Sequence, residues 1–234
     1  MKLQKLYSYV RRAMDDYSMV DDGDKIAVGV SGGKDSLALL YALSGLRKFY
    51  PKKFDIVALT VNLGFENQDF NLIKDFCKNL DVECKIIDTE ISDIVFHKRK
   101  ESNPCSLCAK MRKGSLNDVA KKMGCNKVAY AHHRDDMIET MLMSLIYEGR
   151  FHCFNPVTYL DRMGLNVIRP MMYVPEMDVI GFANKYNLPV AKNPCPVDGH
   201  TKREYIKTLV RQLNRENPNC KDRLFTAVLN GGFD

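Results

Sequence analysis

Long apolar runs, internal repeats and low-complexity tracts are all absent from this sequence of 234 residues. No uninterrupted apolar stretch approaches the roughly 18 residues of a membrane-spanning helix, so a helical membrane protein is excluded. The N-terminal stretch 1–19 is charged throughout and lacks the apolar centre and small-residue cleavage site of a secretory signal. We therefore expect a cytoplasmic protein without a membrane partner.

The positive charge of the chain is concentrated in two segments. Overall, 35 basic residues stand against 29 acidic ones, for a net charge of +6. Residues 97–123 contain eight Lys or Arg against two acidic residues, and residues 201–223 contain seven against three. These segments are either solvated helix faces or a track for a polyanion such as RNA.

Apolar periodicity predicts strands that alternate with helices. Short β-branched runs predict strands at 25–30, 55–62, 83–87, 127–131 and 167–169. Amphipathic patterns predict helices at 3–17, 36–49, 68–80, 105–123, 135–147, 175–187, 202–215 and 220–229. The alternation predicts an α/β fold with a doubly wound parallel sheet of about five strands. We divide the chain into an N-terminal helix and turn (1–24), the sheet domain (25–191) and a helical C-terminal segment (192–234).

The stretch SGGKDS, residues 31–36, joins the first strand to a helix. Gly32 and Gly33 let the backbone approach an anion, and the helix that follows offers free N–H groups. Ser31 and Ser36 can donate to phosphate oxygens, Lys34 neutralises charge, and Asp35 can bind Mg²⁺. The stretch matches neither the Walker A pattern nor the G-x-G-x-x-G pattern. A simple turn needs neither Lys34 nor Asp35, so the composition favours phosphate binding.

Three of the eight cysteines have the setting of metal ligands. Cys105 and Cys108 are three residues apart at a predicted helix start, and Cys195 follows an Asn-Pro pair as Cys105 does. Disulfide bonds are not expected in the cytoplasm. The three thiolates suit zinc with a fourth ligand, for which His97, Asp198 and His200 are candidates, or an iron-sulfur cluster with one open iron. A thioredoxin-like pair fits less well because of the third cysteine.

A second polar stretch, AHHRDDMIET at 131–140, leaves the fourth strand and opens a helix. Its carboxylates lie where a helix dipole favours negative charge, so Asp135 has a capping role as its simplest interpretation. Adjacent histidines at a strand end point in different directions, which argues against His132 and His133 as ligands of one metal. Ligands of such sheets bind beyond the carboxyl ends of the strands, where both polar stretches fall.

These motifs together resemble a known family. SGGKDS resembles the pyrophosphate loop of the N-type ATP pyrophosphatases. With CSLCAKMRKG (105–114), AHHRDDMIET and the late Pro-Cys at 194–195, the chain resembles the tRNA 2-thiocytidine synthetases from about residue 25 to residue 207. The resemblance implies that Cys105, Cys108 and Cys195 hold a [4Fe-4S] cluster. Asp198 stands where many members have a further cysteine, which makes it the candidate fourth ligand.

The resemblance also assigns an ATP site. It implies that Lys34, Asp35 and Asp136 act in catalysis and that Asp35 holds Mg²⁺. The residues expected to bind the nucleotide are Val30, Ser31, Gly32, Gly33, Lys34, Asp35, Ser36, Leu59, His132, Asp135 and Thr140. Among these, Val30 and Leu59 are placed beside adenine from their positions at strand ends.

The implied reaction is ATP-dependent thiolation of a tRNA pyrimidine, with cytidine as the first choice and AMP and pyrophosphate as products. Segments 97–123 and 201–223 would bind the tRNA, and a cysteine desulfurase or free sulfide would donate sulfur. Both a monomer and a homodimer stay open. The alternatives are thiolation of a uridine or a small metabolite, a synthetase that couples an amine without any cluster, as lysidine and NAD synthetases do, and an ATP-binding regulator without turnover.

Overall fold

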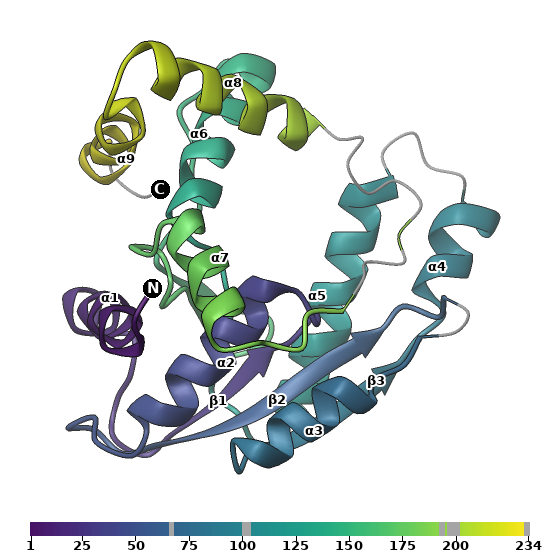
Figure 1. The fold of residues 1–234 in the computed structure, drawn as a ribbon. Helices are drawn as coiled ribbons and strands as arrows, with labels where there is room; N and C mark the ends of the chain where they lie inside the picture. Colours follow the sequence, from purple (N-terminus) through teal and green to yellow (C-terminus); the bar gives the residue numbers. More distant parts are fainter. Residues whose placement is uncertain (66–67, 100–103, 192–194, 196–201, 232–234) are drawn as a thin grey trace.

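The computed structural model describes residues 1–65, 68–99, 104–191, 195 and 202–231. Within this part of the chain, a six-stranded sheet has the strand order β3-β2-β1-β4-β6-β5 (Figure 1). The strands are β1 (Asp24–Gly29), β2 (Phe54–Asn62), β3 (Glu83–Asp88), β4 (Lys127–Ala129), β5 (Val157–Leu160) and β6 (Leu165–Ile168). All neighbouring pairs are parallel except β5 with β6. The predicted α/β class and parallel sheet are confirmed.

The antiparallel edge strand β5 was not predicted. It pairs with β6 so that Val157 faces Ile168 and Leu160 faces Leu165. The intervening turn ends at Gly164, which has a φ of +63° and suits a tight reversal. The fifth predicted strand, 167–169, corresponds to β6, which begins two residues earlier and ends one residue earlier, so Arg169 lies outside the sheet.

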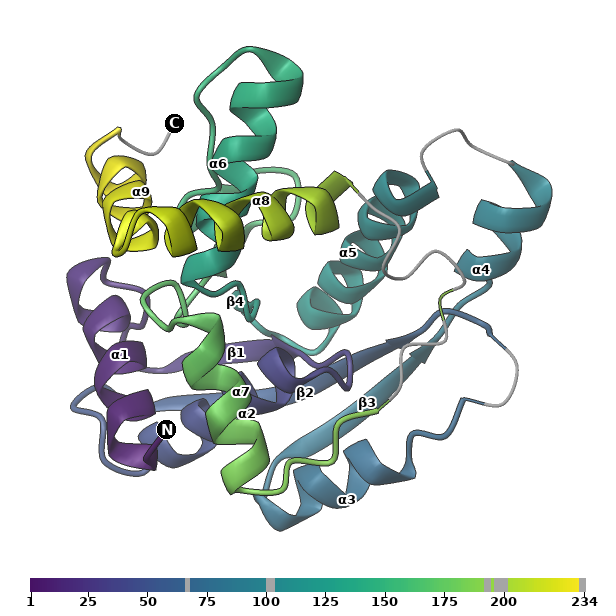
Figure 2. The same ribbon diagram turned by 45° about the horizontal axis from the view of Figure 1, so that its top comes forward.

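The helices pack on both faces of the sheet. They are α1 (Leu3–Asp16), α2 (Lys34–Leu46), α3 (Asn71–Asn79), α4 (Ile91–Asp93), the π-helical turn η1 (Ile94–Lys98), α5 (Pro104–Lys122), α6 (Arg134–Glu148), α7 (Glu176–Lys185), α8 (Lys202–Glu216) and α9 (Cys220–Asn230). Helix α5 covers one face and packs on β2, β3 and β4, while α1, α2 and α7 pack together on the other. Helices α8 and α9 pack on α6, and α8 crosses it (Figure 2).

Alternating side chains of the central strands divide the core into two layers. Ile26 and Val28 of β1 join the layer that contains α1, α2 and α7, whereas Ala27 joins the layer under α5. The first layer also includes Ile206 of α8 and Phe225 of α9. The segments 1–24, 25–191 and 202–231 thus share one hydrophobic core. None of the described helices combines the length and the apolar character needed to cross a membrane.

Strand order places the two polar stretches side by side. β1 and β4 are parallel neighbours, with Val28 opposite Ala129, so the loops that follow them leave the same edge of the sheet. The chain winds from β1 towards β3 on one side and places β4 and β6 on the other. The β1–β4 boundary is therefore the switch point at which α/β proteins bind ligands, as predicted.

Candidate active site

The loop at 31–36 is shaped by its own serines. The Ser31 amide donates to Ser36 Oγ at 3.1 Å, and Ser36 Oγ donates to the Gly33 carbonyl at 2.9 Å. Gly32 has a φ of +81°, and a Cβ there would lie 3.2 Å from Ala191 Cβ. Because the first N–H groups of α2 have no acceptor within the helix, the loop presents free donors beside Lys34. This arrangement suits a bound phosphate group.

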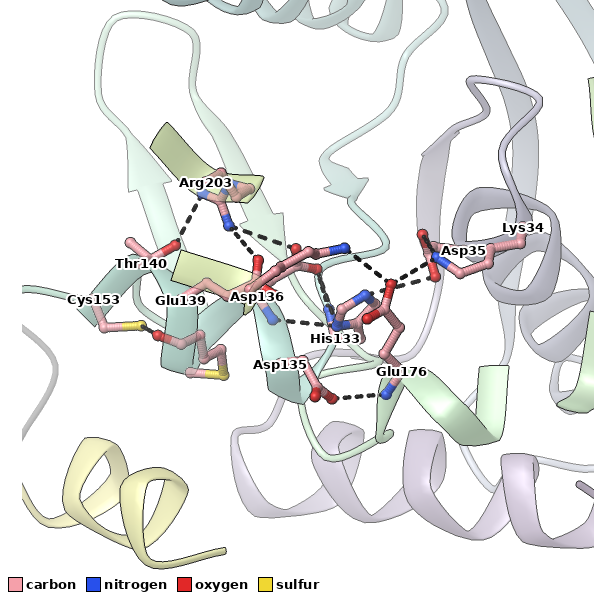
Figure 3. Close-up of polar contacts among 12 residues, drawn as sticks. Lys34, Asp35, His133, Asp135, Asp136, Glu139, Thr140, Cys153, Glu176 and Arg203 are labelled. Carbon is pink, nitrogen blue, oxygen red and sulfur yellow. Dashed lines mark hydrogen bonds and ion pairs between the residues drawn. The ribbon is translucent and has the colours of Figure 1, made fainter. Parts of the chain in front are cut away.

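Lys34 lies in a network of opposite charges (Figure 3). Its ammonium donates to Asp35 Oδ2 at 3.0 Å and to Glu176 Oε1 at 3.2 Å. Lys207 of α8 donates to the same Glu176 oxygen at 3.0 Å. Burial opposes the charged form of Lys34, but Asp35 and Glu176 outweigh it and raise the pKa of Lys34. The lysine is thus held charged at the loop.

His133 connects the two polar stretches (Figure 3). Its Nδ1 accepts from the Asp136 amide at 3.2 Å, and Asp136 Oδ2 accepts from the His133 amide at 2.9 Å, which forms a capping box at the start of α6. With Nδ1 as the acceptor, the neutral ring carries its proton on Nε2, which lies 3.7 Å from Asp35 Oδ1. Asp35 and Asp136 therefore flank one imidazole ring.

The simplest interpretation of Asp135, that it caps α6, is wrong. The cap is made by His133 and Asp136, and Asp135 instead points towards α7 and α9. Its Oδ2 accepts from the Glu176 amide at 2.7 Å, and its Oδ1 accepts from Lys221 Nζ at 2.6 Å. Burial alone would raise its pKa, but these two donors outweigh burial and lower the pKa of Asp135.

Arg203 of α8 lies over the second turn of α6. It donates to Glu139 Oε2 at 3.3 Å and to Thr140 Oγ1 at 3.2 Å, and it lies 3.7 Å from Asp136 Oδ1 (Figure 3). Glu139 is 3% exposed, and burial raises its pKa to about 7. Three cations of the predicted RNA-binding segment 201–223, namely Arg203, Lys207 and Lys221, therefore pair with carboxylates of this site.

The two histidines point in different directions, as predicted. The ring of His132 packs against Phe154, with 4.6 Å between the ring centroids. Burial, together with the charges of nearby Arg169, Lys113 and Arg203, lowers the pKa of His132 to about 3. His132 is therefore neutral, and it faces the β6 side of the site.

The strand-end residues placed beside adenine are buried side chains. Val30 is 2% exposed and Leu59 is fully buried. The Val30 amide donates to the Leu59 carbonyl at 2.8 Å, which fixes the two strand ends together. Contact of these residues with adenine stays a prediction.

The cysteines are free thiols. Cys105 is exposed at the start of α5, and Cys108 and Cys195 are half-buried. Burial raises the pKa of Cys108, and the thiols of Cys195 and Cys105 are close enough to raise it further, against the charge of Arg112. No group of three metal-binding side chains is assembled within the described residues. Asp198 and His200 lie outside them. Of the other five cysteines, Cys77, Cys125 and Cys153 are buried in the core, and Cys84 and Cys220 are half-buried.

Comparison with known proteins identifies the family. Residues 3–213 match the PP-loop domain family. The chain is 37% identical over 233 residues to the tRNA-cytidine(32) 2-sulfurtransferase of Geobacter sulfurreducens, covering 98% of this chain and 91% of that protein. It is 38% identical over 232 residues to the protein of the same name from Geobacter metallireducens, covering 98% and 90%. The chain belongs to the tRNA-cytidine(32) 2-sulfurtransferase family of PP-loop proteins. The resemblance drawn from its motifs is confirmed, and we call residues 31–36, which lie within the matched domain, the PP-loop.

Solved structures agree with this sulfurtransferase family. The U34-tRNA thiolase NcsA from Methanococcus maripaludis, solved with its [4Fe-4S] cluster, has a TM-score of 0.79 and 25% identity, covering 97% of this chain and 77% of that chain. The NH3-dependent NAD synthetase from Campylobacter jejuni has a TM-score of 0.52 and 19% identity, covering 98% and 93%. The second likeness shows a shared fold.

Glu176, Arg203, Lys207 and Lys221 are site residues that the sequence did not single out. Glu176 follows Pro175 at the start of α7, where an acidic residue is an ordinary helix-start signal. The three cations belong to a segment whose charge pattern resembles a solvated helix face. Each acquires its partner only through the packing of α7, α8 and α9 around α6.

Proposed function

We propose that this protein catalyses the ATP-dependent 2-thiolation of cytidine 32 in tRNA. The observation that carries the proposal is the coincidence of a PP-loop with relatives of this activity that match almost the whole chain. In the reaction, cytidine O2 attacks the α-phosphorus of ATP and pyrophosphate leaves. Hydrosulfide then adds to C2, and the former O2 departs with AMP.

The chain's own groups favour the first step. Lys34 and the free N–H groups at the start of α2 would stabilise the negative charge that develops on the departing pyrophosphate. Asp35 and Asp136 are candidates to hold Mg²⁺, because carboxylates are its preferred ligands. The buried Oδ1 of Asp35 has no hydrogen-bond partner within the described residues, which fits a cation there. Bound Mg²⁺ would supply further neutralisation of the pyrophosphate.

Cys105, Cys108 and Cys195 are the proposed ligands of a [4Fe-4S] cluster. Three cysteine thiolates are a donor set that such clusters take, and although the three side chains are not assembled around one point in this structure, Cys105 and Cys195 both raise the pKa of Cys108. When bound, the cluster supplies an iron with affinity for inorganic sulfur. Asp198 stays the candidate fourth ligand. A cysteine desulfurase or free sulfide would donate the sulfur, in the cytoplasm.

Fewer cations face RNA than the sequence suggests. Arg203, Lys207 and Lys221 are paired with carboxylates of the candidate active site. The exposed cations of the segment 201–223 include Arg211 and Arg215. Segment 97–123 keeps exposed cations along α5, which also carries Cys105 and Cys108. The tRNA would therefore approach over α5 and α8.

The test is a thiolation assay with anaerobically purified protein. Transfer RNA from cells lacking this protein, incubated with ATP and sulfide, should gain 2-thiocytidine at position 32 and yield AMP, as measured by mass spectrometry. Cys105→Ser and Cys108→Ser should abolish product and bound iron, and Cys220→Ser, a half-buried cysteine of α9, should leave both unchanged. Full activity in the Cys105 and Cys108 variants would instead favour a synthetase that needs no cluster.

A further inference from the structure

Four cations meet at the carboxyl end of β6. Arg112 and Lys113 come from α5, Arg169 follows β6, and Arg203 comes from α8. Burial of its ammonium and the positive charges of Arg169, Arg112 and Arg203 lower the pKa of Lys113, so these three guanidinium groups lie in the surroundings of Lys113. Within the described part of the chain, only Arg203 has a carboxylate partner. We call these four residues the cationic cluster.

Arg169 is the unusual member of the cluster. It is 7% exposed, and buried arginines are ordinarily paired with a carboxylate. Its Nη1 donates to the Asn155 carbonyl and to Thr158 Oγ1, and its guanidinium lies 4.9 Å from the centre of the Phe154 ring. All these partners are neutral, and the buried Nε has no partner among the described residues. The buried positive charge of Arg169 thus has no anionic partner among the described residues.

Arg169 lies two strands away from the PP-loop, whereas Arg203 lies beside Asp136. β6 pairs with β4, which pairs with β1, so Arg169 lies at the same sheet edge as the PP-loop. Two strand spacings amount to about 10 Å, so the backbone at Arg169 lies about that far from the strand that leads into the PP-loop. Arg112 follows Cys108 by four residues on α5, so the cluster borders the cysteine site.

We infer that the cationic cluster binds a backbone phosphate of the tRNA beside the nucleotide that is thiolated. The inference rests on the proposed function and adds to it Arg169, which lies in neither basic segment. A guanidinium fork matches phosphate oxygens in a bidentate geometry. Bases of single-stranded loops are recognised when splayed out, and the adjoining phosphate then follows the base into the site.

The test compares RNA binding with ATP binding in charge variants. The variants are Arg169→Gln and the exposed Lys113→Ala, and Lys48→Ala removes an exposed cation beyond the far end of α2 as a control. Binding of an anticodon stem-loop RNA with cytidine at position 32 is measured by fluorescence anisotropy across a salt series. ATP binding is measured by calorimetry.

In both cluster variants, RNA affinity should fall about tenfold, as expected for loss of a charged hydrogen bond. The slope of log affinity against log salt should become shallower by about 0.7 to 1. ATP affinity should not change, and Lys48→Ala should bind RNA like the wild type.

Unchanged RNA affinity and slope in a folded Arg169→Gln protein and in Lys113→Ala would overturn the inference. A fall in ATP affinity without a fall in RNA affinity would also overturn it and make the cluster a nucleotide subsite. If Arg169→Gln does not fold, the RNA affinity and salt slope of Lys113→Ala alone test the inference. Thiolation of cytidine 32 by the wild-type protein is measured on the same preparation. Absence of the thiolated product would refute the proposed function, whereas unchanged RNA binding in the variants would refute only this inference.

Discussion

The buried carboxyl of Glu139 should make the stability of this protein depend on pH. Burial, opposed by Lys207 and Arg203 and reinforced by Asp136, raises its pKa from 4.5 to about 7. The folded state therefore binds this proton more tightly than the unfolded state. The resulting stabilisation is complete below pH 4.5 and is lost as the pH rises through 7. At about 1.4 kcal/mol for each tenfold change in proton affinity, this amounts to about 3 kcal/mol.

The variant Glu139→Gln isolates this contribution, because the amide keeps the shape of the protonated carboxyl and does not titrate. At pH 5 the wild-type carboxyl is already largely neutral in the folded state. At pH 8 it is ionised and buried, with Arg203 as its ion-pair partner. The free energy of unfolding of the variant, relative to wild type, should therefore rise by about 2 to 3 kcal/mol from pH 5 to pH 8.

Urea unfolding at pH 5, 6, 7 and 8 measures this difference through the transition midpoints. Glu148→Gln, which removes an exposed carboxylate from the end of the same helix, controls for the loss of one negative charge. Parallel curves of stability against pH for wild type and Glu139→Gln would refute the reasoning. They would mean that the proton affinity of Glu139 is the same in the folded and unfolded protein.

Three further predictions concern the site and the core. His133→Ala should lower the melting temperature by about 2 to 4 °C, as expected for loss of a helix cap. His133→Asn can still accept a hydrogen bond from the Asp136 amide, so its melting temperature should stay close to that of the wild type. An equal fall in both variants would contradict the capping role. Lys34→Met should weaken ATP binding at least about tenfold by calorimetry, since a charged donor to phosphate is lost, and unchanged affinity would remove Lys34 from the ATP site. Phe182→Ala should cost about 3 to 5 kcal/mol in urea unfolding, because this fully buried ring packs against Tyr41; a cost below about 1 kcal/mol would mean that the core closes over the cavity.

Local sequence determines most of the sheet and the PP-loop. β1 and β2 are apolar runs buried on both faces, which is typical of central parallel strands, and both were predicted within a few residues. The loop 31–36 depends on neighbours in the sequence, since Ser31 and Ser36 hydrogen-bond within it. The placement of both polar stretches at one sheet edge followed from strand parallelism alone.

Long-range packing determines what the sequence did not reveal. Glu176 reaches Lys34 across 142 residues and Lys221 reaches Asp135 across 86, and no periodicity encodes such pairs. β5 has only four residues, and its pairing depends on a turn at Gly164 rather than on a long apolar run. The third cysteine was identified from its flanking residues and the family resemblance, because nothing in its local pattern specifies its distance from α5.

The ion pairs that join α8 and α9 to α6 have a consequence for the folding of the newly made chain. A chain folds from its N-terminus as it is made, so Asp135 and Glu139 emerge before Lys221 and Arg203, the cations that pair with them. Lys221, which pairs with Asp135, is among the last of these residues to be synthesised. Until α8 and α9 have been made, Asp135 and Glu139 therefore lack the ion-pair partners that they have in the folded protein. The charge balance of the site is therefore completed only when the C-terminal helices have packed on α6.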